Sequence, residues 1–319
     1  NKKSERNYIH FRICRGSLHG RDDQWKRNAF DEVCKKATER GLRVTGSELV
    51  GLIPLKCMLD AGKYFLEKQQ RSTGISDREL IRIAVKSMGL DELGPFDPEE
   101  RIIEYKMGKA EGRLVKMSLT AFADETASES PAPGGGSIAA YVGALGVSLG
   151  TMVANLSSHK KGWDERWKEF SDWAEKGQRL KTQLLAMVDE DTNAFNRIMQ
   201  AFSLPKGTDV EKKARTAEIQ AATKYATEVP FQVMQLAVST FEVIGAMAEQ
   251  GNPNSVTDAG VGAACARTAV LGAYLNVRIN AAGLTDKDFA ADILARAKAV
   301  YEQAQKTEQD ILRIVESKI

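Results

Sequence analysis

The stretch Pro131–Ser137 reads PAPGGGS and runs directly into an uncharged series of small and apolar residues, Ile138–Leu156. Its prolines restrict the backbone, its three glycines permit unusual conformations and a close approach to another group, and Ser137 is placed to cap the helix that follows. The unpaired N–H groups and partial positive charge of a helix N-terminus favour a carboxylate or an electron-rich ring beside them. The pattern predicts the mouth of a site, with an ordinary flexible turn as the alternative.

The uncharged series is 19 residues long, close to the length that crosses a bilayer. It is rich in Ala and Gly, however, and the polar residues Ser148, Thr151 and Asn155 recur along it. These features favour a helix packed on all sides within a bundle over a membrane span. The small side chains permit close approach of neighbouring helices.

The composition is typical of a soluble globular protein of about two domains: 319 residues, 43% hydrophobic and 28% charged. The formal net charge is only +2, so the chain as a whole gives no general case for binding nucleic acid. The cysteines lie far apart without a CxxC or zinc-ligand spacing, which indicates free thiols in a reducing compartment and predicts a cytoplasmic location. They are Cys14, Cys34, Cys57 and Cys265.

Residues 1–28 differ in charge from the rest of the chain. They contain eight Lys and Arg against three Asp and Glu, whereas the remainder contains 37 against 40. The segment has neither the alternation of a strand nor the stripe of a helix, and we expect it to be a poorly ordered leader. It also lacks the continuous apolar core of a secretory signal.

The fold class is predicted to be mainly α, with an all-helical bundle preceded by an incomplete α/β subdomain. The subdomain covers residues 29–107, a polar linker follows at 108–117, and the bundle covers 118–319. In the subdomain we expect helices at 29–40, 55–70 and 76–88, extended chain at 42–54 and a strand at 101–105. In the bundle we expect helices at 119–128, 138–156, 163–202, 209–250, 254–282 and 286–318, the fourth bent at Pro230.

One face of the expected helix 163–202 carries a carboxylate among apolar residues. This inward seam comprises Leu180, Leu184, Val188, Asp191, Phe195, Ile198 and Phe202. Burial of Asp191 is costly unless the carboxylate has a partner, and desolvation raises its pKa toward the range useful for proton exchange. A structural pairing with a Lys or a helix N-terminus is the alternative. The neighbouring Asp189 and Glu190 are expected to face solvent.

The expected helix 254–282 has a stripe of small residues with polar groups at both ends: Ser255, Asp258, Gly262, Cys265, Ala269, Gly272, Asn276 and Asn280. Such a stripe leaves room for a planar heterocycle with donors and acceptors around it, or serves only for tight helix packing.

Lys160 and Lys161 offer charge to an anionic tail, although such a pair is commonly a solvated helix end. His159 has no second His or Cys beside it, so no metal site is predicted.

Several motifs together resemble one known family. The segment 118–319 resembles the cyclodeaminase domain of formiminotransferase-cyclodeaminase, and segments upstream resemble the end of the formiminotransferase part. The motifs are SPAPGGGS at 130–137, VDED at 188–191 followed by Ala194-Phe195, GAYLNV at 272–277 with Asn280, GSELVGLIPLK at 46–56, the stretch 90–98 and RIIEY at 101–105. The likeness covers about nine-tenths of the chain in the order of the family.

The resemblance implies an all-helical, dimer-forming enzyme that converts 5-formiminotetrahydrofolate to 5,10-methenyltetrahydrofolate and ammonia, within histidine breakdown and one-carbon metabolism. It implies that Asp191 is the catalytic carboxylate and that no metal or redox cofactor is needed beyond the folate substrate. Lys160 and Lys161 are then expected to receive the glutamate tail. The residues expected to hold the pterin are Pro133, Gly134, Gly135, Gly136, Ser137, Ser255, Asp258, Asn276 and Asn280.

The expected partners are the folate and further copies of the same chain, not nucleic acid or a membrane. The family's transferase histidine belongs to a subdomain with no counterpart in this sequence, so transferase activity is expected to be absent. Two alternatives to the cyclodeaminase stay open. One is a methenyltetrahydrofolate cyclohydrolase of the same helical superfamily, and the other is a non-catalytic module for folate binding or oligomerisation.

Overall fold

The structure, a computed structural model, describes residues 24–108 and 114–319. The chain divides into two compact units, Asn1–Glu111 and Gly112–Ile319, and the division falls inside the segment expected to be a linker. Helix α1, Gln24–Glu39, begins within the segment set apart as a leader. The expectation of disorder for residues 1–23 lies outside the described residues.

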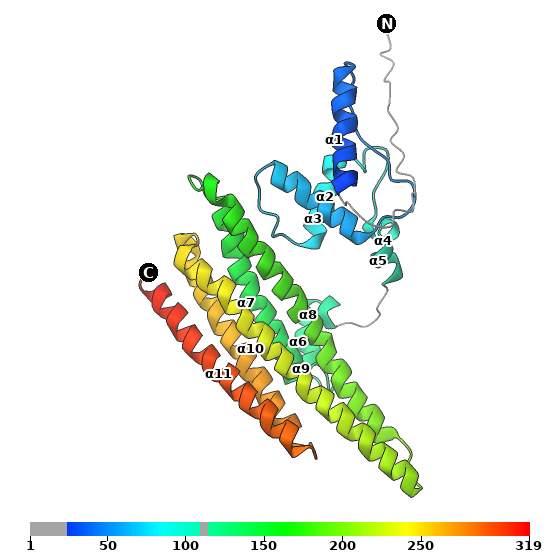
Figure 1. Ribbon diagram of the computed structural model, residues 1–319, viewed down its shortest axis with the longest axis vertical. Coiled ribbons are helices and arrows are strands. Elements are labelled where there is room, and N and C mark those ends of the chain that lie inside the picture. Colours follow the sequence, from blue (N-terminus) through cyan, green and yellow to red (C-terminus); the bar gives the residue numbers. More distant parts are fainter. Residues whose placement is uncertain (1–23, 109–113) are drawn as a thin grey trace. The chain divides into compact units, whose positions relative to one another are not determined.

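The first unit is helical where the sequence suggested a mixture of helix and strand (Figure 1). Besides α1 it contains α2 (Leu55–Lys68), α3 (Asp77–Met88), α4 (Pro98–Arg101) and α5 (Ile103–Met107). The strand expected at 101–105 is wrong, because Asp97 caps α4 and Pro98 occupies its first position, so the chain turns into helix there. The described residues form no strand, but Ile53 and Ile102 make an isolated parallel bridge and Glu48 also takes part in an isolated bridge.

The core of this unit is formed where α2 crosses α3. Met58, Ile81 and Ile102 are buried together, and a β-carbon on Gly62 would lie 2.2 Å from the backbone oxygen of Leu80. A glycine is therefore required at this crossing, because any side chain would separate the two helices.

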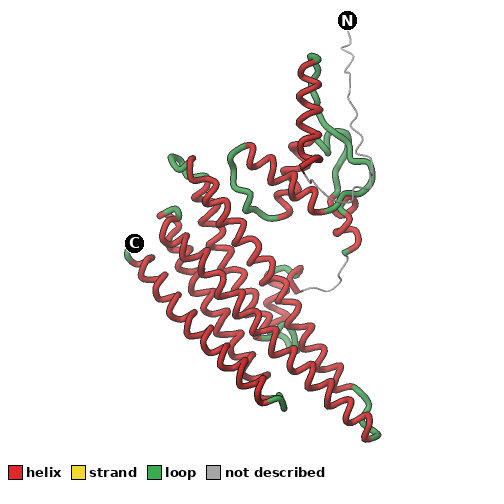
Figure 2. Tube along the Cα trace, in the orientation of Figure 1, coloured by secondary structure: helices red, strands yellow, loops and turns green. Residues whose placement is uncertain are grey.

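The second unit is a bundle of long helices, as predicted (Figure 2). It consists of α6 (Leu119–Thr126), α7 (Gly135–Ser158), α8 (Trp167–Ser203), α9 (Asp209–Gln250), α10 (Val256–Ala282) and α11 (Lys287–Glu316), with short 3-10 turns η1 (Leu114–Lys116), η2 (Asp164–Arg166) and η3 (Pro253–Ser255). All six predicted helices are confirmed, with ends displaced by a few residues. Pro230 is buried within α9, which continues through it.

Helix α7 is central: it packs against α8, α9 and α10. Its contact with α10 is antiparallel and close, because a β-carbon on Gly146 would lie 2.8 Å from the backbone oxygen of Gly262, and one on Gly272 would lie 3.1 Å from the Ala139 β-carbon. The small-residue stripe of α10 is thus filled by α7. The middle of that stripe serves helix packing and leaves no room for a heterocycle.

By length and composition alone, α7 and α9 are apolar enough to cross a membrane. Their most apolar windows are 61% and 56% buried inside the chain, which fits core helices of the bundle.

Candidate active site around Asp191

The carboxylate of Asp191, on α8, lies against the first turn of α7. Its Oδ2 accepts hydrogen bonds from the backbone N–H of Ser137 (2.8 Å) and from the Ser137 hydroxyl (3.1 Å). That hydroxyl also approaches the backbone oxygen of Val188, at 2.9 Å. Ser137 is fully buried and does not cap its own helix: the N-cap is Gly134, and it makes no side-chain cap bond. Asp191 supplies the negative charge that the N-terminus of α7 favours.

The glycine run is needed for close approach rather than for unusual backbone angles. Gly134, Gly135 and Gly136 are not among the glycines with positive φ. A β-carbon on Gly136, however, would lie 2.1 Å from Oδ1 of Asp191, whereas one on Gly134 would meet nothing closer than 3.8 Å. Gly136 alone of the three is therefore required by its contact with the carboxylate.

The pKa of Asp191 is raised above its ordinary value, as predicted, chiefly because burial penalises the charged form. The two hydrogen bonds from Ser137 act in the opposite direction and favour the carboxylate. Oδ1 accepts no hydrogen bond from the described residues and is not sealed from solvent. One oxygen is therefore held and the other is open, which suits an acid that exchanges protons with a ligand.

The end of α10 contributes amide groups near this turn. The Asn276 side chain lies beside Gly135, where a β-carbon would be 3.3 Å from Nδ2, and Nδ2 donates to the Gly272 backbone oxygen. Within the part of the chain described, Oδ1 of Asn276 accepts no hydrogen bond. Asn280 instead donates to the Ala226 backbone oxygen at 2.7 Å, so its amide joins α10 to α9.

The remaining candidates lie at the opposite end of the bundle. Helix α7 has 24 residues and is about 36 Å long, and Lys160 and Lys161 follow its far end. Ser255 and Asp258 begin α10 at that same end, where the Asn252 N–H donates to the Ser157 hydroxyl. Within one chain these four residues therefore lie at the other end of the bundle from Asp191, because α7 and α10 are antiparallel. That they contribute to the same site stays a prediction.

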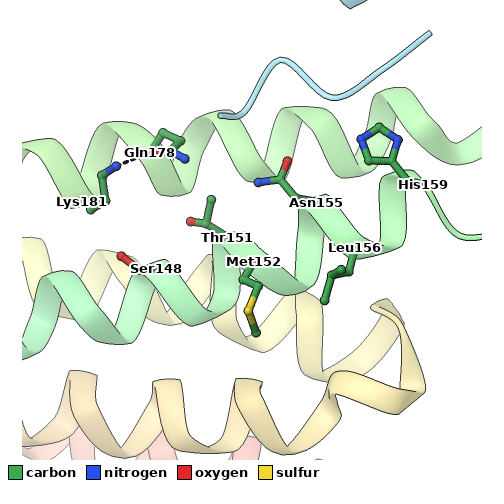
Figure 3. Close-up of a pocket in the computed structure, with 8 residues that line it drawn as sticks. All are labelled: Ser148, Thr151, Met152, Asn155, Leu156, His159, Gln178 and Lys181. Atoms are coloured by element: carbon green, nitrogen blue, oxygen red, sulfur yellow. Dashed lines mark hydrogen bonds between the residues drawn. The ribbon is translucent and has the colours of Figure 1, made fainter. Parts of the chain in front are cut away.

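A cleft of about 520 Å³ lies between α7 and α8, away from Asp191 (Figure 3). Its lining combines apolar, amide and basic side chains: Ser148, Thr151, Met152, Asn155, Leu156, His159, Gln178 and Lys181. Sequence reasoning noted His159 and the polar residues of α7 but missed Gln178 and Lys181. Gln178 and Lys181 are three residues apart, which places both on one face of α8, and this spacing could have identified them in the sequence.

The seam of α8 is buried only in its first half. Leu180, Leu184 and Val188 are buried, but Phe195 is 36% exposed and Phe202 is 50% exposed. The first turn of α7 meets α8 at Asp191, so the apolar residues beyond that level lack α7 as a neighbour.

Asp189 and Glu190 do not simply face solvent. Asp189 accepts from the Leu114 backbone N–H at 2.8 Å, and Glu190 pairs with the hydroxyl of Tyr225. Across residues 24–108 and 114–319, no group of three or more His, Cys, Asp or Glu is arranged to hold a metal ion.

The mostly buried carboxylate of Asp191 at the N-terminus of α7 is typical of a helical-bundle protein whose site depends on an acidic side chain. Comparison with known proteins identifies the family. A model described as formiminotransferase-cyclodeaminase matches residues 118–299, and one described as formiminotransferase domain matches residues 22–108. The chain belongs to the formiminotransferase-cyclodeaminase family. The second match also begins within the segment 1–28 that was expected to be unmatched.

Named relatives support this membership. Formimidoyltransferase-cyclodeaminase of Gallus gallus is 35% identical over 91% of this chain and 54% of that protein, so the chain spans about half the length of this relative. Methenyltetrahydrofolate cyclohydrolase of Methylorubrum extorquens is 38% identical over 63% of this chain and 97% of that protein. The crystal structure of formiminotetrahydrofolate cyclodeaminase from Thermotoga maritima matches with a TM-score of 0.57 and 27% identity, over 63% of this chain and 97% of that one.

Proposed function

We propose that the chain is a formiminotetrahydrofolate cyclodeaminase that forms 5,10-methenyltetrahydrofolate and ammonia. The observation that carries the proposal is the carboxylate of Asp191, mostly buried, with Oδ2 held by Ser137 and Oδ1 open. Family membership supplies the substrate class. The reaction needs one group that takes up and returns a proton, and no cofactor beyond the folate.

The proposed chemistry begins with attack of N10 on the carbon of the protonated formimino group. The N10–carbon bond forms, the carbon–nitrogen π electrons move to the imino nitrogen, and Oδ1 of Asp191 takes the proton from N10. Asp191 then returns this proton to the amino group. The carbon–nitrogen bond then breaks, and its electron pair leaves with ammonia. The lone pairs of N5 and N10 form the delocalised carbon–nitrogen double bond of the amidinium.

The raised pKa of Asp191 supports this role, because a carboxyl group with an ordinary pKa returns a proton poorly near neutral pH. The open oxygen supports it as well, since the proton must move between Asp191 and two nitrogens of the substrate. Asn276, whose Oδ1 accepts no bond from the described residues, is proposed to accept an N–H of the pterin.

We further propose a homodimer in which α7 and α10 face their own copies. This face exposes large apolar side chains of both helices: Leu145, Met152, Leu156, Val261, Leu275 and Ile279. Exposed apolar patches of this kind are typical of association surfaces. With a two-fold axis perpendicular to α7, the end that carries Lys160 and Asp258 in one copy approaches Asp191 of the other. The lysines are then available to the glutamate tail of a folate bound across the two copies.

The second candidate is methenyltetrahydrofolate cyclohydrolase activity, which the 38% identity to the bacterial enzyme of that name favours. It uses the same helical bundle and the same folate class but opens the methenyl ring with water. The two functions differ in whether ammonia is released.

The deciding experiment supplies 5-formiminotetrahydrofolate and 5,10-methenyltetrahydrofolate separately, measures ammonia, and follows the absorbance of the methenyl product. We expect ammonia from the first substrate, and we expect Asp191→Asn to bind folate without turnover. Asp189→Asn is the matched control, since its carboxylate is engaged by Leu114 outside the site. Absence of ammonia from the wild-type chain, or normal ammonia release by Asp191→Asn, would reject the proposal.

A further inference from the structure

Phe195 and Phe202, on α8 beyond Asp191, are exposed although their spacing continues that of the buried seam. Phe195 is four residues after Asp191, so it lies on the same face of the helix, about 6 Å further along its axis. Met199 and Phe202 follow on this face and are 52% and 50% exposed. Helix α8 runs on for about 18 Å past Asp191 to Ser203, and α8 and α9 project beyond the other helices of the second unit in Figure 1.

The cause of this exposure is the starting point of α7. Gly136 and Ser137 meet α8 at the level of Asp191, and the helix does not extend further in that direction. An adjacent side of α8, turned by about 100° from Phe195, is covered, since Ala194 is buried with Ala226 and Val229 of α9. The uncovered strip therefore begins at the residue that carries the proposed chemistry.

The expected orientation of Phe195 also places its ring near the site at Asp191. Helical side chains lean toward the N-terminus of their helix, over the residue four positions earlier. We therefore expect the ring of Phe195 to lean toward the turn that carries Asp191, whose Oδ1 is open. A flat aromatic face one turn from an open carboxylate oxygen suits a planar, electron-rich ring, which prefers offset stacking or edge contacts with such a face.

We propose that Phe195 is a positioning residue that packs against the bicyclic ring of the substrate and holds it over Oδ1 of Asp191. The inference rests on the proposed folate substrate and assigns a role to a residue for which the sequence had suggested only burial. Phe202 shares the face and the aromatic ring but lies about 16 Å from Asp191 along the helix, so it has no such role.

The test uses 5-formyltetrahydrofolate, in which oxygen replaces the imino nitrogen, as an unreactive probe for the full chain. In Phe195→Trp, the added indole emission is expected to fall on titration with the probe, relative to the wild-type titration. In Phe202→Trp it is expected to stay unchanged. Phe195→Leu is expected to weaken binding by about 5- to 10-fold, while Phe195→Tyr binds within about 2-fold of wild type.

Phe202→Leu is the matched control and is expected to bind as wild type. Light scattering on both leucine variants separates a substrate contact from a contact between copies, since loss of the oligomer in Phe195→Leu would overturn the proposal. Wild-type affinity in Phe195→Leu would also overturn it. If Phe195→Leu fails to fold, the pair of tryptophan variants decides: an unquenched Phe195→Trp that still binds the probe rejects the contact.

Failure of the Phe195 contact can be distinguished from failure of the proposed cyclodeaminase activity. A chain that binds the probe through Phe195 but releases no ammonia from the formimino substrate refutes the activity and supports the contact. A chain with normal ammonia release whose Phe195 variants bind like wild type refutes the contact alone.

Discussion

Gly136 and Asp191 are in such close contact that a β-carbon on the glycine would stand 2.1 Å from Oδ1 and 2.5 Å from Cγ of the carboxylate. The next residue, Ser137, donates both its backbone N–H and its hydroxyl to the same side chain. The first turn of α7 and the acid of α8 are thus one structural unit. A change in either is expected to alter the other.

Gly136→Ala is expected to displace the Asp191 side chain, because the alanine methyl group would overlap with Oδ1 and Cγ of the carboxylate, at 2.1 and 2.5 Å. We predict a fall in kcat/KM for ammonia release of about 100-fold or more, since a displacement of about 1 Å at a reacting group has this scale of effect. The free energy of unfolding should fall by about 1–3 kcal/mol, as for other overpacked sites. Steady-state kinetics and urea denaturation measure the two effects.

Gly134→Ala is the matched control for this prediction. A β-carbon at this position would meet nothing closer than 3.8 Å and its φ is −99°, so alanine fits without strain. Equal losses of activity in the two variants would show that flexibility of the glycine run, rather than the contact with Asp191, is what matters.

Ser137→Ala is expected to raise the pKa of Asp191 further. The hydroxyl stabilises the ionised form, and the variant loses that bond while it keeps the backbone N–H. If the carboxylate form takes the N10 proton, the acidic limb of the pH profile of kcat/KM moves to higher pH. Ser148→Ala, which removes only a hydroxyl bonded within its own helix, should leave the profile unchanged. A Ser137→Ala profile that superimposes on that of wild type would contradict the assignment.

Asp191→Asn is expected to make the chain more stable at neutral and alkaline pH. Because the folded-state pKa of Asp191 is raised, its contribution to stability is fully present below the unfolded pKa and is lost as pH rises through the folded pKa. Asparagine is neutral throughout and keeps an acceptor oxygen for Ser137. The difference between the two free energies of unfolding should therefore grow as pH rises through the titration of Asp191 and level off above it.

Urea titrations of both proteins across this pH range test the prediction, because other groups titrate equally in both and cancel in the difference. A variant less stable than wild type at every pH would mean that the charged carboxylate stabilises the N-terminus of α7 more than burial penalises it.

The helices of the second unit and the burial of Asp191 were accessible from sequence because they depend on local spacing. Leu184, Val188 and Asp191 repeat at helical intervals, and a polar residue in such a series is recognisable without knowledge of its neighbours. The same logic failed at Phe195 and Phe202. Their exposure depends on where α7 begins against α8, and that register is a tertiary property.

The distribution of the candidate site residues between the two ends of the bundle could not be predicted from the sequence for a similar reason. Asn276 and Asp258 lie on one stripe of α10, yet they are about 27 Å apart along the helix, and only Asn276 is near the glycine run. A periodic stripe identifies a face but not which part of it meets a given partner. In the first unit, residues 101–105 had the apolar pattern of a strand, but Asp97 and Pro98 start a helix just before them.

The proposed composite site predicts that two inactive variants restore activity when they form one dimer. The double variant Lys160→Ala/Lys161→Ala and the variant Asp191→Asn alter opposite ends of the bundle, so each homodimer contains two damaged sites. In a mixed dimer, the two-fold arrangement combines the intact Asp191 of one copy with the intact lysines of the other. Co-expression with two affinity tags and tandem purification yields mixed dimers, which should show about half of the wild-type kcat/KM.

Lys168→Ala combined with Asp191→Asn provides the control, because Lys168 pairs with Asp172 on the exposed side of α8. Mixed dimers of that double variant with wild type should retain about half of the activity, through the wild-type acid alone. If mixed dimers of the lysine and aspartate variants form but have no more activity than the parent homodimers, the lysines and the acid do not meet across the interface. The glutamate tail would then have to be bound near Asp191 within one copy, where the lysine pair does not reach.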